Sequence, residues 1–220
     1  MEYRSDLPER PRRMRNLPID DRGFPIPWFV HIDNGKADFR VIRPGGIAVA
    51  HNRELCWLCG ERRGVYLTFV VGPMCGINRV TAEPPCHSEC AEYAARACPF
   101  LTRPLAVRNE RDMPEDADVA GIMIKRNPGV TLLWTTKSYK PFRANGGSGA
   151  LFRLGEPTDL KFYAKGRLAT PAAIAASVAG GYPLLEKMAH EDGPNAVKSL
   201  NHQREVFDRL IVRWAETGNP

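Results

Sequence analysis

The chain has 220 residues, and its 43% hydrophobic and 25% charged content is typical of a soluble globular protein. The longest apolar runs, such as residues 67–74, are far too short to span a bilayer, so we expect no membrane partner. No apolar secretory segment follows Met1, which predicts a cytoplasmic location where the six cysteines stay reduced and serve metal binding or burial. The formal net charge of +6 permits a nucleic-acid partner without requiring one.

We predict an α+β fold with four segments: a basic proline-rich arm over residues 1–27, a β-hairpin and zinc module over 28–101, a connection over 102–118, and an antiparallel sheet with C-terminal helices over 119–220. The arm contains the stretch PERPRRMRNLP, with four arginines and three prolines and no hydrophobic period. This composition favours a flexible or extended arm, and the alternative is a basic arm that docks on a partner or on phosphates.

The elements of the first half follow from turn residues and side-chain type. Asn34-Gly35 predicts a β-hairpin over residues 28–42. Two β-rich stretches, 65–71 and 77–82, predict a second hairpin with Cys75 at its tip. An Ala-rich stretch over 87–98 predicts a short helix that Pro99 ends.

The second half of the chain is predicted to form strands followed by helices. Turn residues separate four β-rich stretches, which predict an antiparallel meander over 119–124, 129–140, 149–155 and 159–166. Thr170-Pro171 predicts a helix start and Gly180-Gly181 its end. A second helix is predicted over 183–191, and apolar residues at helical spacing predict an amphipathic helix over 195–216 that packs on the sheet.

Two cysteine-containing motifs predict a metal site. Cys56 and Cys59 lie two residues apart and Gly60 follows, a spacing typical of a zinc knuckle. His87 and Cys90 are three residues apart at the start of the predicted helix, so they share one face and complete a tetrahedral set. A knuckle, strands and a helix in this order resemble a treble-clef site over residues 53–99.

Some alternatives remain open for this site. Cys86 is an alternative to His87 as the third ligand, and an iron–sulfur cluster would need Cys86 in addition to the other three cysteines. Cys75 and Cys98 are expected to be spare thiols. Because two or three thiolates close the site and no general base lies nearby in sequence, a structural Zn²⁺ ion is favoured over a catalytic one.

Two sets of basic residues are candidates for nucleic-acid contact. The first set lies around the zinc module and consists of Arg62, Arg63, Arg79 and Arg96. The second set interleaves basic and aromatic residues in the predicted sheet, a pattern typical of single-strand binding faces; it consists of Lys125, Arg126, Lys137, Lys140, Arg143 and Arg153 with Trp134, Tyr139 and Phe142. The alternative for the second set is an ordinary solvated sheet face.

The string from GFPIPWFV through CWLCG and FVVGPMCGINRVTAEPPCHSECAEYAARACPFL to RNPGVTLLWTTKSYK resembles an uncharacterised family of bacterial and prophage proteins. The resemblance implies a bacterial or phage context and no particular activity. We therefore expect a zinc-stabilised protein that binds nucleic acid or another protein. The alternatives are an enzyme with an active site assembled from distant residues, and a structural subunit of a larger assembly.

Overall fold

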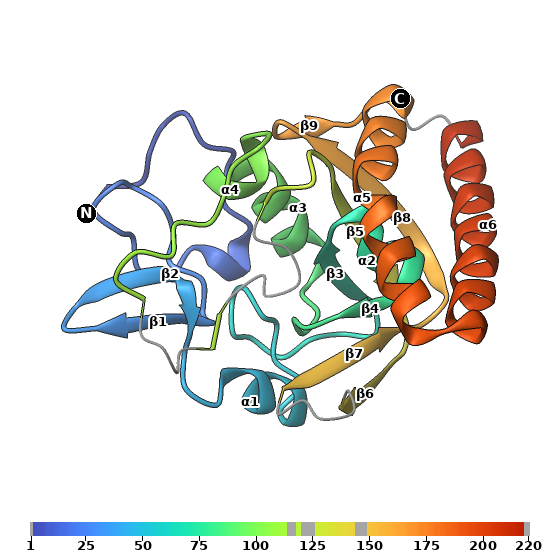
Figure 1. Ribbon diagram of the computed structural model, residues 1–220. Helices are drawn as coiled ribbons and strands as arrows, with labels where there is room; N and C mark the ends of the chain where they lie inside the picture. The colour runs from blue at the N-terminus through green and yellow to red at the C-terminus, as the bar shows by residue number, and fades with distance from the viewer. Residues whose placement is uncertain (1, 114–117, 120–125, 144–148, 218–220) are drawn as a thin grey trace.

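A computed structural model describes residues 2–113, 118–119, 126–143 and 149–217 (Figure 1). It contains both helices and antiparallel strands, so the predicted α+β class is confirmed. The elements in chain order are η1 (Arg12–Met14, a 3₁₀ helix), β1 (Val30–Asp33), β2 (Lys36–Ile42), α1 (Gly46–Asn52), β3 (Leu67–Val71), α2 (Pro73–Asn78), β4 (Val80–Thr81), α3 (Ser88–Ala97), α4 (Pro99–Thr102), β5 (Thr131–Thr136), β6 (Tyr139–Arg143), β7 (Ala150–Leu154), β8 (Pro157–Ala164), β9 (Arg167–Leu168), α5 (Pro171–Asp192) and α6 (Pro194–Glu216).

The strands form three antiparallel sheets, with the orders β1-β2, β3-β5-β8-β9 and β4-β7-β6. The first is the predicted hairpin, and its turn residues Asn34 and Gly35 both have positive φ, as a two-residue turn of this kind requires. Each larger sheet combines one strand from before residue 102 with strands from after residue 118. The two halves of the sequence are therefore joined by backbone hydrogen bonds.

The central strand β5 is buried along its whole length, because both faces of the four-stranded sheet are covered. Its side chains alternate between two hydrophobic cores. Leu132 and Trp134 point into one core, and Leu133 points into the other. We name these the helix-covered core and the cysteine-rich core.

The helix-covered core lies between the sheet and helices α2, α5 and α6, with α5 and α6 side by side along one side of the molecule (Figure 1). Helix α6 buries Leu200, Phe207 and Trp214 at helical spacing, so the predicted amphipathic helix is confirmed. The Trp214 ring meets the Phe162 ring of β8 edge to face, with centroids 4.9 Å apart. This contact fixes α6 on the sheet.

The cysteine-rich core lies on the opposite face of the sheet, beneath α3 and the N-terminal segment. Met14 in η1 is only 1% exposed and packs in this core. Residues 11–27, predicted to be part of a flexible or extended arm, therefore include an anchored segment, because the apolar side chain of Met14 is buried among the cysteines and Trp57.

The predicted hairpin over 65–71 and 77–82 is wrong. Strand β3 pairs with β5 and β4 pairs with β7, while residues between them form α2, with Cys75 inside this helix. Pro73 starts the helix at its first position, and nearly all of α2 is buried. A short helix that is buried on all sides has the same continuous apolar sequence as a buried strand, so the pattern did not separate the two.

Two further predictions are corrected. Residues 129–140 do not form one strand, because the chain turns at Lys137-Ser138 and leaves the four-stranded sheet for the three-stranded one. Helix α5 continues through Gly180-Gly181 and contains Pro183. The glycines do not end it, since Gly181 packs so closely on α2 that a Cβ atom there would lie 2.8 Å from Met74 Cγ.

Of the predicted strand over 119–124, all but Val119 lies outside the described residues, and Val119 forms an isolated bridge with Val41. No helix in the described part of the chain combines the length and the apolar character that crossing a bilayer requires.

Candidate metal centre

The first two cysteines lie in a tight loop that closes on itself. The amide of Cys56 donates to the carbonyl of Glu61 at 2.7 Å, and the amide of Gly60 donates to the carbonyl of Cys56 at 2.9 Å. Gly60 has a φ of 76°, and a Cβ atom there would lie 2.4 Å from Cδ1 of the Trp28 ring. Only glycine meets both conditions, so this residue sets the shape of the loop that presents the two thiols.

The other two side chains come from the start of α3. The backbone of Cys86 exchanges two hydrogen bonds with Thr68 of β3, at 2.7 and 3.0 Å, which fixes the chain just before the helix. His87 then takes the N-cap position in an extended conformation, and Cys90 lies three residues later in the first turn. The sheet therefore determines where these two side chains point.

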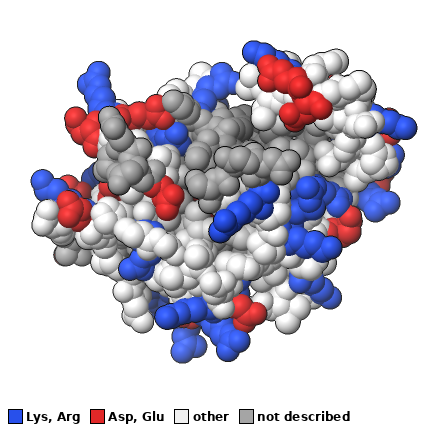
Figure 2. Space-filling view, turned by 60° about the horizontal axis from the view of Figure 1, so that its bottom comes forward, with Lys and Arg blue, Asp and Glu red and all other residues white. Residues whose placement is uncertain are grey.

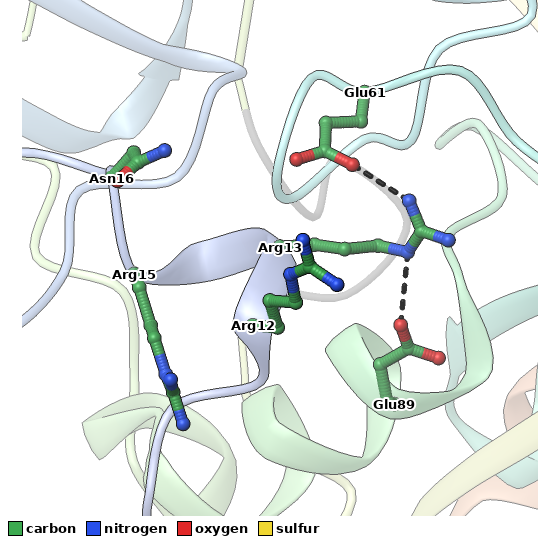
Figure 3. Close-up of a pocket in the computed structure, with 6 residues that line it drawn as sticks. All are labelled: Arg12, Arg13, Arg15, Asn16, Glu61 and Glu89. Atoms are coloured by element: carbon green, nitrogen blue, oxygen red, sulfur yellow. Dashed lines mark hydrogen bonds and ion pairs between the residues drawn. The ribbon is translucent and has the colours of Figure 1, made fainter.

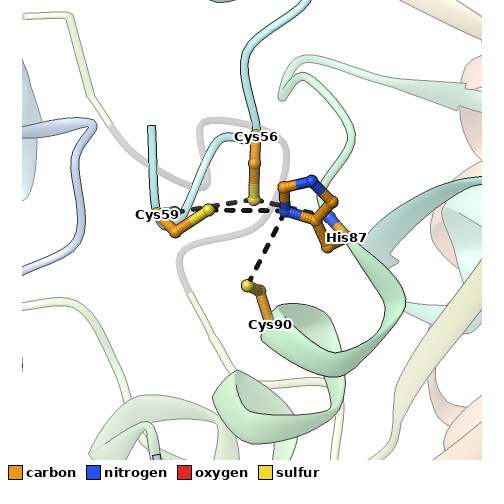
Figure 4. A group of neighbouring side chains, drawn as sticks. All are labelled: Cys56, Cys59, His87 and Cys90. Carbon is orange, nitrogen blue, oxygen red and sulfur yellow. Dashed lines mark hydrogen bonds between the residues drawn. The ribbon is translucent and has the colours of Figure 1, made fainter. Parts of the chain in front are cut away.

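The structure brings Cys56, Cys59, His87 and Cys90 together, with their four potential ligand atoms all within 4.8 Å of one another (Figure 4). All four residues are buried, and their thiols are free. His87 Nδ1 lies 3.4 Å from Cys59 Sγ and 3.9 Å from Cys90 Sγ. Around a tetrahedral zinc ion, sulfur and nitrogen ligands are separated by about 3.5–3.8 Å. The cluster thus has the composition and spacing of a four-ligand metal site.

The orientation of the His87 ring matches this use. Its Nε2 lies 3.0 Å from the carbonyl oxygen of Arg62, at the end of the cysteine loop. Because a carbonyl only accepts hydrogen bonds, Nε2 carries a proton, and Nδ1 is the ring nitrogen that would present a lone pair to a metal ion among the sulfur atoms. Metal-binding histidines are held in the same way by a partner on the second ring nitrogen.

The electrostatics of the cluster favour a cation. Burial alone would raise the pKa of the Cys56 thiol, but hydrogen bonds from the neighbouring thiols and from His87 lower this pKa far below its usual range. Hydrogen bonds with Cys56 and Cys59, together with burial, raise the pKa of Cys90. Hydrogen bonds to Cys56 and Cys59 raise the pKa of His87 to about 10. Without a metal ion, thiols this close oppose one another's ionisation; a divalent cation would allow all three to ionise.

The remaining three cysteines lie outside this group. The side chain of Cys86, the alternative third ligand, is 1% exposed, and burial raises the pKa of its thiol well above the usual range. Cys75 lies in α2 and Cys98 at the end of α3. The clustered group thus contains His87 and leaves out Cys86, whose thiol contacts Cys56.

An arginine from the N-terminal segment connects the two halves of the cluster. Arg13 forms ion pairs with Glu61, which follows the cysteine loop, and with Glu89 in the first turn of α3, at 2.7 and 3.0 Å (Figure 3). Arg12 and Arg15 line the same open hollow, whose volume is about 700 Å³. The N-terminal segment therefore contacts both segments that supply the sulfur and nitrogen atoms.

The four arginines predicted to contact nucleic acid near this centre differ in accessibility. Arg62 and Arg96 are exposed, and Arg62 pairs with Glu54 at 2.9 Å. Arg79 pairs with Glu156 and lies over the Trp134 ring. The side chain of Arg63 is turned inward, with the residue only 9% exposed, so it is not accessible to a phosphate backbone at the surface.

Arg63 and its neighbours form a polar contact that sequence reasoning missed. Its Nη2 donates to the hydroxyl of Tyr139 at 3.2 Å, and Nδ1 of His51 lies 2.8 Å from the same hydroxyl. The three residues come from the segment after the cysteine loop, from β6 and from α1. Their separation along the sequence carries no motif, so only the fold shows that Arg63 links the cysteine loop to the three-stranded sheet.

The second predicted set, of basic and aromatic residues, does not form one continuous surface, because some of its members point inward. Trp134 is fully buried and Tyr139 faces the helix-covered core, so neither can stack on a base, contrary to the prediction. Lys140 and Arg153 lie directly opposite each other on β6 and β7, and both are exposed. Phe142 lies two residues from Lys140 on the same face, with its ring 5.2 Å from the Arg153 guanidinium. Lys125 lies outside the described residues.

No protein-family model, no curated protein and no solved structure matches this chain. The resemblance to bacterial and prophage proteins therefore stays a prediction.

Proposed function

We propose that this protein is a zinc-stabilised protein that binds single-stranded nucleic acid. A Zn²⁺ ion would be held by Cys56, Cys59, His87 and Cys90. Three thiolates and one imidazole are ligands that zinc prefers, and four protein ligands leave no open position for a substrate or a catalytic water. The metal would therefore be structural, in the manner of a treble-clef site.

One observation carries the nucleic-acid proposal: the outward face of the β4-β7-β6 sheet places Lys140 directly opposite Arg153. Like charges at directly opposite positions destabilise a sheet unless an anion lies near them. The three strands contain Lys140, Arg143 and Arg153 but neither Asp nor Glu. In the described part of the chain neither Lys140 nor Arg153 forms an ion pair, so both charges are available to phosphates.

Apolar side chains lie beside these cations. Phe142 and Leu151 are opposite each other on the same outward face and are partly exposed. A basic groove with an aromatic platform binds single strands, because phosphates pair with the cations while unstacked bases lie on the ring. Figure 2 shows Lys and Arg side chains outnumbering Asp and Glu on the end of the molecule that carries α1, β6 and β7. This combination favours a single strand over a duplex.

The metal centre would support this surface through a short chain of contacts. His87 bonds the carbonyl of Arg62, and the side chain of the next residue, Arg63, bonds Tyr139 on the inner face of β6. Lys140 follows Tyr139 and points outward. Loss of the metal would therefore weaken nucleic-acid binding indirectly, by loosening β6.

Fluorescence anisotropy with labelled single-stranded and duplex oligonucleotides tests the proposal. The double variant Lys140→Glu/Arg153→Glu is expected to weaken single-strand binding by at least about tenfold, and the affinity of the unaltered protein should fall steeply between about 50 mM and about 200 mM salt. Lys198→Glu/Arg209→Glu, two exposed sites on α6, is the matched control with the same change in net charge. Absence of binding to every oligonucleotide at low salt would contradict the proposal and favour a protein partner.

Metal analysis of purified protein tests the zinc proposal separately. Cys59→Ser and His87→Ala are each expected to lower the zinc content, whereas Cys98→Ser, which lies outside the cluster, should not. Unchanged zinc in both cluster variants would exclude this ligand set. We also propose a reducing cytoplasm as the location of the protein, and the six free thiols support this proposal.

A further inference from the structure

An apolar cavity lies between the N-terminal segment and the sheet, and its lining includes Trp57 and Leu58 of the cysteine loop. Its volume is about 450 Å³, within the range of about 300–1,000 Å³ that is typical of small-molecule sites. One wall comes from the N-terminal segment and the β1–β2 hairpin, with Phe24, Phe29 and Phe39. The opposite wall comes from β3, α3 and the segment that enters β5, with Val70, Ala97 and Val130.

The lining of this cavity is mostly apolar and includes aromatic and aliphatic side chains from both walls. Contact with an apolar body would remove this surface from water, which is favourable. The lining therefore favours a ligand with an apolar body.

The charges around the cavity identify the other end of such a ligand. The described lining residues include four arginines and one glutamate, Glu83. Three of the arginines already have carboxylate partners, since Arg22 pairs with Asp20, Arg40 with Asp38 and Arg108 with Glu110.

The fourth arginine differs. Arg126 is exposed, lines the cavity and forms no ion pair with the described residues. It pairs with Val107 in an isolated β-bridge, and Val107 is 65% exposed, so a cation without an ion-pair partner among the described residues lies beside an exposed apolar residue in the lining. A ligand entering here would meet the cation with its anionic group.

We propose that this cavity binds a small amphipathic anion, with an alkyl or aromatic body inside the cavity and a single carboxylate at Arg126. A guanidinium and a carboxylate form strong charge-assisted hydrogen bonds. The cavity thiols fit the apolar end, because burial raises the pKa of Cys75 to about 11 and keeps its thiol uncharged. This site is independent of the proposed nucleic-acid face, which lies on the other sheet.

The test uses the full metal-loaded chain and the fluorescent probe 1-anilinonaphthalene-8-sulfonate, which carries an aromatic body and one anionic group. The probe should bind the folded protein, and dodecanoate should displace it. Dodecylammonium has the same alkyl body with a cationic head and should displace the probe far less well. Failure of the folded protein to bind the probe, or equal displacement by both surfactants, would overturn the proposal.

Two variants locate the binding. Arg126→Gln should weaken dodecanoate binding by about tenfold, whereas Arg209→Gln on the distant surface of α6 should leave it unchanged. Ala97→Leu should occupy part of the cavity, weaken probe binding and leave the melting temperature unchanged or higher. If dodecanoate affinity is unchanged in Arg126→Gln, or Ala97→Leu binds the probe as the unaltered protein does, the proposal is wrong.

Discussion

The two faces of the central sheet are covered by cores that differ in construction. The helix-covered core is built from large apolar side chains on two long helices, α5 with 22 residues and α6 with 23. The cysteine-rich core has shorter elements, with α3 at 10 residues, and four of its buried residues are cysteines. The first core can be stabilised by burial alone, whereas the second has less apolar surface to bury and brings a potential metal site into its centre.

This difference indicates which part of the fold a metal cross-link would stabilise. A loop over residues 56–60 and the first turn of α3 are far apart in sequence, and both belong to the cysteine-rich core. A metal ion bound by both would hold them together more strongly than their own packing, because binding free energy of a structural metal is also folding free energy. The helix-covered core needs no such link.

We expect the largest difference between the two cores in their response to metal removal. Structural zinc contributes on the order of 10 kcal/mol to small zinc modules. A chelator is therefore expected to expose the amides of the cysteine loop and α3, while those of α5 and α6 stay protected. Hydrogen exchange measured by mass spectrometry would show this, and an equal loss of protection in α3 and α6 would contradict the distinction.

Truncating a side chain in the helix-covered core should lower the stability of the protein without affecting metal binding. Phe207→Ala removes a ring that is 1% exposed and packs on Phe162, and should cost roughly 3–5 kcal/mol in the free energy of unfolding. Denaturant unfolding gives this value, and zinc content should stay unchanged. A loss of zinc in this variant would mean that the two cores are not separable.

The cysteine loop offers a matched pair of glycines. Gly60 and Gly35 both have positive φ, at 76° and 78°, but only at Gly60 would a Cβ atom meet a neighbour, the Trp28 ring. Gly60→Ala should cost roughly 1–3 kcal/mol more than Gly35→Ala because of this overlap. Thermal unfolding compares the two variants, and equal costs would show that the loop does not pack tightly on Trp28.

Helix α5 offers a second pair with a smaller effect. Gly180 has open space around its Cα atom, whereas Gly181 lies against Met74 of α2. Gly180→Ala should stabilise the protein by roughly 0.5–1 kcal/mol, because alanine favours a helix. Gly181→Ala should lose this gain. A gain in both variants would mean that α5 does not contact α2 as closely as described.

Local chemistry made much of this fold predictable. Asn34-Gly35 indicated the first hairpin, Thr170-Pro171 the start of α5, and the apolar period the last helix. The cysteine spacing and the i, i+3 relation of His87 and Cys90 indicated a cluster that the structure does bring together. Each of these signals lies within a few residues, where backbone geometry limits the alternatives.

The wrong predictions concern positions where tertiary contacts determine the local structure. The sequence over α2 is continuously apolar, and only its burial between α5, α6 and β5 makes it a helix. Gly181 looked like a helix end, but its small size serves contact with Met74. Arg63 looked like a surface cation, yet the fold turns it toward Tyr139. Which face a side chain takes depends on partners that are distant in sequence.

X-ray absorption at the zinc edge tests the central claim most directly, because it reports the metal and its ligand atoms together. For the purified protein we predict one zinc ion with three sulfur ligands at about 2.3 Å and one nitrogen ligand at about 2.0–2.1 Å. The nitrogen signal should disappear in His87→Ala. A purified protein without zinc, or a spectrum with four sulfur ligands that assigns Cys86 to the site, would contradict the account.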